Sequence, residues 1–278
     1  MLFRSSIIIF FLVVYANAIN YGTWNLRYLA PEDSTNGNIW SKRSPHIIDF
    51  IRFYDLDILT SQEVNETQVA NLLDSLPDYR SFKIEKKNEN PIFFKKNRFS
   101  VLDSGEFYLS KTPEKRGWGW DADCIRNCVW LKLKDLESGV IFFVFNTHLD
   151  HKGKTARIES VRLLISKVKM IALSFPFILS GDLNMTPMDQ PYKDLLNSGI
   201  FTEAQSIAKY VSAPTGSFNN FNPQKKPQWQ LDHILVSKNI AVYRYGIINL
   251  LYYDEKIRSV SDHLPVITKW EYTDEARP

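Results

Sequence analysis

Short apolar runs recur along the chain, separated by polar turns and by longer segments with a different spacing. The runs that suit strands cover residues 79–84, 91–95, 99–109, 127–134, 140–148, 176–181, 231–236, 240–249 and 264–270. Two more, at 21–24 and 57–62, lie near the start. Residues 212–229, rich in Pro, Asn and Lys, are predicted to form a loop. Strands that alternate with helical segments are typical of an α/β domain.

Helical spacing of apolar residues marks four segments between these runs. Pro45 predicts a helix start, because proline suits the first turn of a helix. Asn65 and Gln68 have the spacing of a capping box at the start of a second helix. A long helix is predicted over 154–172 and a short one over 188–197. The positions expected to face inward are Ile47, Ile48, Ile51, Tyr54, Val69, Leu72, Leu73, Leu76, Ile158, Val161, Ile165, Val168 and Ala172.

Polar side chains stand at the ends of several strand-like runs. Asp182 and Asn184 follow one run, and side chains two residues apart in a strand point to the same face. Asp262 and His263 come directly before the last run. The same placement holds for Asn25, Glu63, Asn146, His148 and Asp232. Polar groups on the ends of buried strands are held rigidly, which is how α/β sheets build functional sites.

This set of residue types has a definite chemistry. Carboxylate, amide and imidazole groups together can hold a hard cation, activate a water molecule and stabilise a phosphate group. Any single one of them has a structural explanation, as a turn cap or as a buried group with a local partner. The ordered recurrence of six or seven at strand ends favours a functional site.

The ordered motifs resemble those of the endonuclease/exonuclease/phosphatase superfamily. They span residues 21–270 and are Thr23-Trp24-Asn25-Leu26-Arg27, Ser61-Gln62-Glu63, Asn146-Thr147-His148, Gly181-Asp182-Leu183-Asn184, Leu231-Asp232-His233 and Ser261-Asp262-His263. The chain is most similar to a branch of small, exported members, which it resembles at 91–96, 117–122, 146–151, Ala156-Arg157 and Arg126. The resemblance implies a four-layer α/β sandwich, with two packed mixed β-sheets flanked by helices.

Chemistry and resemblance together indicate a metal site. Glu63 is the expected main ligand of Mg²⁺, because this ion prefers one or two carboxylates together with waters and substrate oxygens. Asn25 would support the ion or its water, and Asp262 would complete the ligand set. Mn²⁺ is the expected substitute for Mg²⁺.

The remaining polar residues receive catalytic roles on the same basis. Asp182 would orient or deprotonate the attacking water, and Asn184 would donate a hydrogen bond to the pentacovalent phosphorane. His263, held in its tautomer by Asp232, would bind a phosphate oxygen or assist proton transfer. His148 would stabilise the phosphate from the other side or help the leaving group depart.

Five residues are expected to bind substrate. Arg157 starts the long helix close to the site, although a solvated helix arginine explains it equally well. Asn146 lies two residues before His148. Trp118, Trp120 and Arg126 belong to a loop that interleaves aromatic and cationic residues. This loop could stack nucleobases, lie at a lipid interface or simply pack on a sheet.

Length, composition and charge fit one large enzyme domain. The chain has 278 residues, of which 44% are apolar and 23% charged. Its net charge of +3 is too small to predict tight binding of a nucleic-acid duplex. We expect a monomer.

The first 18 residues have the features of a secretory signal peptide. Arg4 supplies the positive charge, residues 7–15 form a short apolar core, and Ala16-Asn17-Ala18 is a small-x-small cleavage site. Cleavage after Ala18 would leave 19–278 as a single catalytic domain, secreted or lumenal. A retained anchor is the alternative. No second apolar run approaches membrane-spanning length.

Cys124 and Cys128 are the only cysteines. In an oxidising compartment they could form a disulfide, and two buried free thiols are an equal alternative. Two cysteines alone cannot complete a tetrahedral zinc site.

Three functions remain open. A secreted, Mg²⁺-dependent phosphodiesterase that acts on RNA or DNA is favoured. A phosphatase or a phospholipid phosphodiesterase, of the inositol-phosphate or sphingomyelinase type, is the second. A catalytically silent binding protein is the third, and the full set of metal-binding and water-activating groups argues against it.

Overall fold

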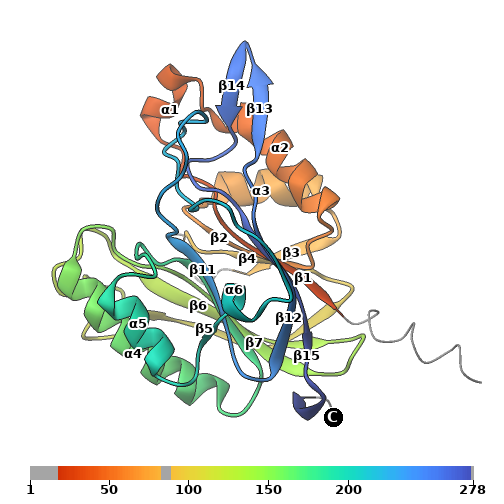
Figure 1. Ribbon diagram of the computed structural model, residues 1–278, viewed down its shortest axis with the longest axis vertical. Helices are drawn as coiled ribbons and strands as arrows, with labels where there is room; N and C mark the ends of the chain where they lie inside the picture. Colours follow the sequence, from red (N-terminus) through yellow and green to blue (C-terminus); the bar gives the residue numbers. More distant parts are fainter. Residues whose placement is uncertain (1–17, 83–88, 277–278) are drawn as a thin grey trace, which may run out of the picture.

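Two β-sheets pack face to face, and helices cover the outer face of each (Figure 1). The computed structural model describes residues 18–82 and 89–276, so the predicted leader lies outside the described residues up to position 17. The first sheet has seven strands, in the spatial order β10 (Tyr210–Ser212), β12 (Ile240–Ile247), β15 (Val266–Tyr272), β1 (Ile19–Asn25), β2 (Ile58–Gln62), β4 (Ile92–Lys95) and β3 (Tyr79–Phe82).

The second sheet has six strands and is mixed like the first. Its spatial order is β5 (Phe99–Tyr108), β6 (Asn127–Asp135), β7 (Ile141–His148), β8 (Phe177–Asp182), β11 (Asp232–Val236) and β9 (Thr202–Glu203). Strands β1 and β2 are parallel in the first sheet, as are β7 and β8 in the second, while their other neighbours run antiparallel.

Four helices form the outer layers, namely α2 (Trp40–Phe53) and α3 (Glu66–Ser75) on the first sheet and α4 (Lys154–Ala172) and α5 (Gln190–Asn197) on the second. The others are α1 (Pro31–Asn36), α6 (Ala204–Ile207) and a 3-10 turn at Asp274–Ala276. Helix α6 contacts strands of both sheets, and its Ala204 belongs to the core between them. One apolar core lies between the sheets, a second joins α2 and α3 to the first sheet, and a third joins α4 and α5 to the second. The predicted four-layer α/β sandwich is confirmed, as are the helix over 154–172 and the capping box of Asn65 and Gln68.

Two predictions about helices were wrong. Helix α2 begins at Trp40, so Pro45 lies inside it, because the buried Arg43 and Ser44 extend the inward face by a turn that apolar spacing cannot reveal. In α4, Ile158 is 37% exposed. The first turns of this helix instead bury Ala156 and Ser160, small residues that give only a weak apolar signal.

A hairpin that the apolar pattern did not predict projects beyond α1 and α2 (Figure 1). It pairs β13 (Leu251–Asp254) with β14 (Lys256–Ser259). Its large side chains are mostly solvent-facing, as Tyr253 is 78% exposed and Ile257 is 57% exposed. Only Tyr252 and Ser259 are buried among residues 251–259, so the hairpin shows no regular alternation of apolar and polar residues, which explains the omission.

Buried polar contacts join the two sheets directly beneath the strand ends. The hydroxyl groups of Tyr21 and Ser180 are 2.6 Å apart, and those of Thr60 and Ser180 are 2.8 Å apart. Nearby, the side-chain amide of Gln62 donates to the Asn146 side-chain oxygen at 2.7 Å. Buried polar groups are costly unless paired, so these contacts fix how one sheet sits on the other.

Cys124 and Cys128 are free thiols in the structure, so the disulfide alternative is not realised there. Among the described residues, no helix has both the length and the apolar character needed to span a membrane.

Candidate active site

The ends of four strands bring the predicted residues to one place. Asn25 ends β1 and Glu63 follows β2, while His148 ends β7 and Asp182 ends β8. Each pair comes from neighbouring parallel strands, whose carboxyl ends meet at the same edge of a sheet. Asp232, the first residue of β11, lies opposite Asp182 in the antiparallel register. Residues from both sheets thus converge.

Asp182 is the centre of this group. Its Oδ2 accepts a hydrogen bond from the Asn25 side chain at 3.2 Å and lies 3.3 Å from Nε2 of His148 and 3.5 Å from Nε2 of His263. Its Oδ1 accepts a bond from the backbone N–H of Asn184 at 2.9 Å. Burial raises the pKa of Asp182 to about 7, an effect that His263 opposes.

His263 is held from its other nitrogen. Its Nδ1 lies 2.8 Å from Oδ2 of the buried Asp232, and Ser217 donates its hydroxyl to the same oxygen at 2.6 Å. This pairing directs Nε2 of His263 toward Asp182. Burial alone would lower the pKa of His263, but Asp232 and Asp182 together hold that pKa well above its usual value.

The second imidazole has the opposite electrostatics. Burial, with smaller contributions from Arg126 and His263, holds the pKa of His148 well below its usual value. One carboxylate oxygen therefore lies between an imidazole that favours the charged form and one that favours the neutral form. Titratable neighbours whose pKa values are driven apart are typical of acid–base sites.

The expected metal ligands lie beside this centre. The Asn25 side chain donates to Oε1 of Glu63 at 3.0 Å, and the backbone N–H of Tyr28 donates to Oε2 at 3.3 Å. Asp262 is buried, and its burial raises its pKa. A guanidinium nitrogen of Arg27 lies 3.8 Å from its Oδ2.

The donors at this place fit a hard divalent cation. Burial raises the pKa of both Asp182 and Asp262, and a neighbouring carboxylate raises each further, Asp232 for Asp182 and Glu63 for Asp262, so a cation would offset this excess of negative charge. Ligand atoms of Asp182, Asp232 and His263 lie within 4.8 Å of one another. A second such group, Asp123, Cys124 and His151, lies on the surface, where Asp123 already pairs with a lysine, Lys152, at 2.9 Å.

Gly181 permits the close approach of β7 and β8 at the centre. Its φ is 142°, and a Cβ atom built on it would lie 1.9 Å from the carbonyl oxygen of Thr147. No side chain fits there. Asn184 follows with φ of 48° and donates its side-chain amide to the carbonyl of Leu149 at 3.0 Å. The Gly181–Asn184 turn therefore depends on special backbone conformations.

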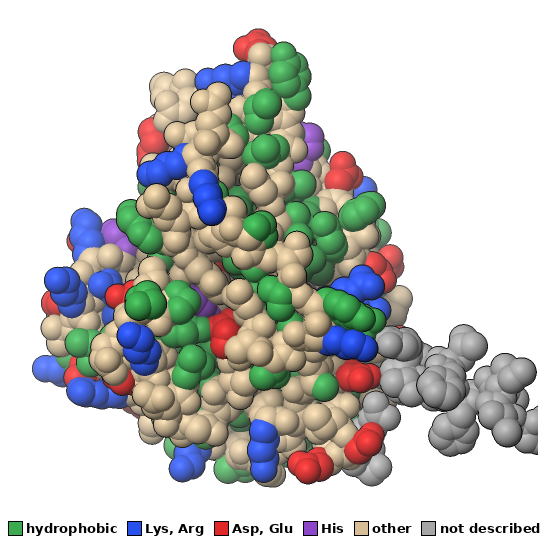
Figure 2. Space-filling view, in the orientation of Figure 1, with side chains coloured by type: hydrophobic (Ala, Val, Ile, Leu, Met, Phe, Trp, Pro, Cys, Tyr) green, Lys and Arg blue, Asp and Glu red, His purple; other side chains and the backbone are tan. Residues whose placement is uncertain are grey.

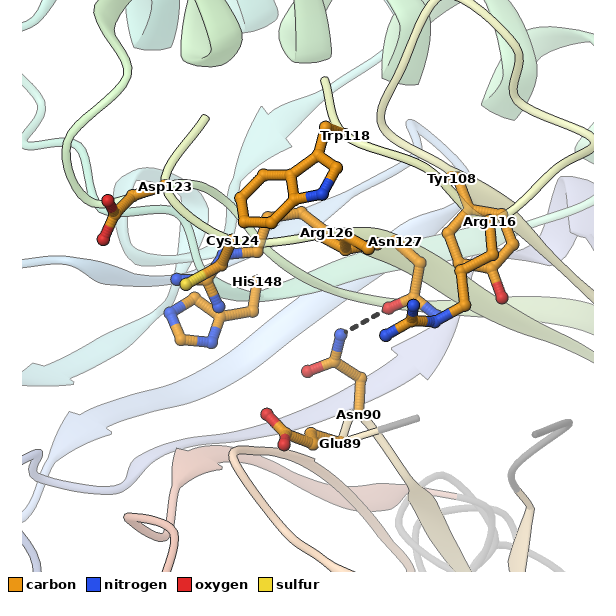
Figure 3. Close-up of a pocket in the computed structure, with 11 residues that line it drawn as sticks. Glu89, Asn90, Tyr108, Arg116, Trp118, Asp123, Cys124, Arg126, Asn127 and His148 are labelled. Carbon is orange, nitrogen blue, oxygen red and sulfur yellow. Dashed lines mark hydrogen bonds between the residues drawn. The ribbon is translucent and has the colours of Figure 1, made fainter. Parts of the chain in front are cut away.

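A pocket of about 320 Å³ opens beside His148 (Figure 3). Of the five expected substrate-binding residues, Trp118 and Arg126 line it. The full lining is Glu89, Asn90, Tyr108, Arg116, Trp118, Asp123, Cys124, Ile125, Arg126, Asn127 and His148.

The structure places the other three expected substrate-binding residues outside this lining. Asn146 is fully buried beneath the centre, where its side chain binds Gln62 and the carbonyls of Ser61 and Pro91. Its polar atoms therefore join the sheets. Arg157 donates to the carbonyl of Asp150 at 2.7 Å. Trp120 is half-buried, with φ of 46°.

Several supporting residues were missed by sequence reasoning. The role of Ser217 depends on a long-range contact with Asp232, which no local pattern encodes. Arg43 is buried in α2 and donates to the carbonyls of Leu26 and Val260, near two of the site segments. The sequence alone does not distinguish a buried arginine that binds backbone carbonyls from an exposed one.

Asp150 organises the loop that carries the pocket. It accepts backbone N–H bonds from Asp123 and Cys124 on one side, and from Lys152 and Gly153 on the other. Burial opposes its ionisation, but these bonds keep its pKa below the usual value. The loop of the pocket is thus tied to the end of β7.

Comparison with known proteins agrees with this geometry. The model of the Endonuclease/Exonuclease/phosphatase family matches residues 22–263. Among solved structures, a mannosyl-6-phosphatase from Bacteroides thetaiotaomicron is 33% identical, with a TM-score of 0.88, over 91% of this chain and 100% of that one. A family protein from Bacteroides vulgatus is 32% identical, with a TM-score of 0.83, over 92% and 99% of the two chains.

Curated relatives are more distant and longer. Protein angel homolog 2 of Bos taurus is 28% identical over 188 residues, which is 61% of this chain and 34% of that protein. The match thus spans about a third of the relative's length.

Proposed function

This chain belongs to the endonuclease/exonuclease/phosphatase family, and we propose that it hydrolyses phosphomonoesters by water attack with the help of a divalent metal ion. The members of the family are phosphoesterases, and this chain is one. The observation that carries the proposal is the position of Asp182, whose Oδ2 lies within 3.5 Å of two imidazoles and an amide.

Glu63, Asn25 and Asp262 would hold the ion, for which Mg²⁺ is the best fit and Mn²⁺ a substitute. The ion would supply positive charge next to the phosphate oxygens. Proton transfer, orientation of the water and further stabilisation of the phosphate are roles of this chain's own side chains.

Asp182 accepts a proton from the attacking water and orients a lone pair of the water oxygen toward phosphorus. His263 donates from Nε2 to a phosphate oxygen, and Asp232 fixes its tautomer through Nδ1. The side-chain amide of Asn184 stabilises the phosphorane. His148 borders the pocket, so it faces the side from which the leaving group departs.

A phosphomonoester is favoured over nucleic acid, which reverses the order suggested by sequence alone. A relative named as a mannosyl-6-phosphatase aligns over 91% of the chain, which makes a sugar phosphate the first substrate to test. On the face of the molecule that Figure 2 displays, Lys and Arg are interspersed with Asp and Glu, and the net charge of the whole chain is only +3. Strong nucleic-acid binding needs concentrated positive charge.

Nucleic acid remains the second candidate because of one observation. Trp118 is 63% exposed and lies on the same pocket as Arg116. Exposed aromatic rings beside cations can stack unpaired bases.

A substrate panel tests the proposal. The enzyme is incubated with each candidate substrate, once with Mg²⁺ and once with EDTA. The substrates are hexose 6-phosphate, p-nitrophenyl phosphate, inositol phosphates, sphingomyelin, single-stranded RNA and single-stranded DNA. We expect metal-dependent release of phosphate from a monoester, absent in Asp182→Asn. Turnover that persists in EDTA, or cleavage of RNA or DNA alone, would contradict the proposal.

We also propose that residues 1–18 are removed as a leader, and that 19–278 act as one secreted, monomeric domain. Strand β1 begins at Ile19, the residue that cleavage after Ala18 would leave first. Intact mass of the protein secreted by its native host tests this. A retained Met1 on the secreted protein would contradict it.

A further inference from the structure

His148 is the one residue of the catalytic centre among those that line the pocket beside it. In Figure 3, Trp118 lies on one side of it, with Glu89 and Asn90 on the opposite side. His148 lies toward one end and Arg116 toward the other. A group bound there would reach the centre through His148, which lies 3.3 Å from Asp182.

Its floor is a fixed hydrogen-bonded chain. The Asn90 side chain donates to Asn127 at 2.8 Å, and Asn127 donates in turn to Glu106 at 2.8 Å. The Tyr108 hydroxyl donates to the other oxygen of Glu106 at 3.1 Å. The side chain of Thr147 holds the Asn127 carbonyl at 3.0 Å. Planar polar groups locked in this way offer donors and acceptors at set positions.

The charges that line the pocket balance. Arg116 and Arg126 both act electrostatically on Glu89, and Asp123 pairs with Lys152 at 2.9 Å. A second phosphate or a polyanion would meet carboxylates as well as guanidinium groups. A neutral, hydrogen-bonding group meets no such repulsion.

The backbone next to Trp118 makes a close contact. Trp118 is 63% exposed, and the next residue, Gly119, lies so close to Leu109 that an added Cβ would be 2.0 Å from the Leu109 carbonyl oxygen. Asp150 fixes the far part of the same loop. The loop backbone that carries Trp118 is thus held at two points, and Trp118 lines the same pocket as Asn90 and Asn127.

We propose that this pocket binds the alcohol part of the substrate, and that this part is an uncharged, hydroxyl-rich ring such as a hexose. Ring hydroxyls would pair with Asn90, Asn127 and the guanidinium groups, while the C–H face of the ring would lie on Trp118. The volume of about 320 Å³ is at the small end of ligand pockets, which suits a single ring. This inference rests on the proposed function.

The test compares two esters of the same chemical type. Hexose 6-phosphate and n-butyl phosphate are both primary alkyl phosphates, but only the first has ring hydroxyls. Phosphate release by the Mg²⁺-loaded enzyme should show a kcat/KM at least about 10-fold higher for the hexose ester, since a site built for hydroxyls rejects analogues that lack them. A hexose 1,6-bisphosphate should be a poorer substrate than the monophosphate.

Variants locate the preference. Trp118→Ala and Arg116→Ala should each lower the ratio of the two kcat/KM values by about 3- to 10-fold, as expected for a lost aromatic face or hydrogen bond. Trp118→Phe should restore most of it. Tyr253→Ala and Arg162→Ala are matched controls, because both residues are exposed and lie on β13 and α4, outside the pocket lining. The controls should leave the ratio unchanged.

A binding measurement separates this inference from the proposed function. Calorimetry with Asp182→Asn and Mg²⁺ should show binding of hexose 6-phosphate that Trp118→Ala weakens by a similar factor. Hydrolysis of both esters at equal kcat/KM would overturn the pocket assignment and leave the function standing. If the enzyme hydrolyses no monoester but Trp118→Ala still weakens binding of hexose 6-phosphate, the proposed function would be overturned and the pocket assignment would stand. Tighter binding of a single-stranded oligonucleotide than of the sugar phosphate would also overturn the inference.

Discussion

Asp182 contacts His148, and Trp118 lines the pocket that His148 borders, yet the surroundings of Asp182 and Trp118 are opposite in kind. Asp182 is 1% exposed at the end of a central strand and contacts groups from both sheets. Trp118 is 63% exposed on a loop that Asp150 and Gly119 tie down. A rigid, buried centre suits a common reaction, while a surface loop can vary to select the substrate.

The largest effect should come from breaking the centre. Asp182→Asn keeps the shape but cannot take a proton, so activity should fall on the order of 10²–10⁴-fold with the fold intact. His263→Ala should lose a comparable amount, and Asp232→Asn less, because Asp232 positions His263 without touching substrate. Steady-state kinetics with circular dichroism checks this. Near-normal turnover by Asp182→Asn would contradict the account.

The next effect concerns the backbone beneath the centre. Gly181→Ala should destabilise the protein by more than about 3 kcal/mol, because the new methyl group would collide with the carbonyl of Thr147. Gly139→Ala is the matched control, since Gly139 also has positive φ but no atom near its Cβ position, and it should cost about 1 kcal/mol. Urea unfolding of both variants measures the difference. Equal losses would show that the close contact is unimportant.

A smaller effect is expected from a substitution in the loop that lines the pocket. Asp150→Asn puts an amide where backbone N–H groups now donate to carboxylate oxygens, so it should cost about 1–3 kcal/mol. It should raise KM for the hexose ester more than it lowers kcat. Asp103→Asn is the control, because the Asp103 side chain also accepts a hydrogen bond from a backbone N–H, that of Ser104, but at an exposed position on β5. A kcat loss as large as that of Asp182→Asn would erase the distinction between the two regions.

Sequence reasoning succeeded best where the chain is most regular. The strand ends supplied Asn25, Glu63, His148, Asp182, Asp232 and His263, and the structure brings all six together. Period-two and helical spacing located the sheets and α4 because burial imposes those patterns. The link between apolar pattern and burial fails in two places. Helix α2 buries polar residues in its first turns, so its start was misplaced, and the hairpin at 251–259 is largely exposed, so it was not predicted.

The pocket could be predicted only in part for a related reason. Its loop stood out because Trp118 and Trp120 lie between Arg116 and Arg126 in the sequence, but its floor depends on Asn90, Asn127 and Glu106, which come from three distant segments. Asn146 was expected to face substrate because it shares a strand face with His148. Its partners across the sheets, Gln62 and Ser61, make it a structural link instead.

A double-mutant cycle on hexose 6-phosphate hydrolysis tests the central claim most directly. If Asp182 and His263 act as one unit, the Asp182→Asn/His263→Ala double variant should lose far less than the product of the two single losses. Asp182→Asn combined with Trp118→Ala should instead show nearly multiplicative losses, because the pocket acts separately. Multiplicative losses for Asp182 and His263 would contradict the account, since the two groups would then not share one transition state.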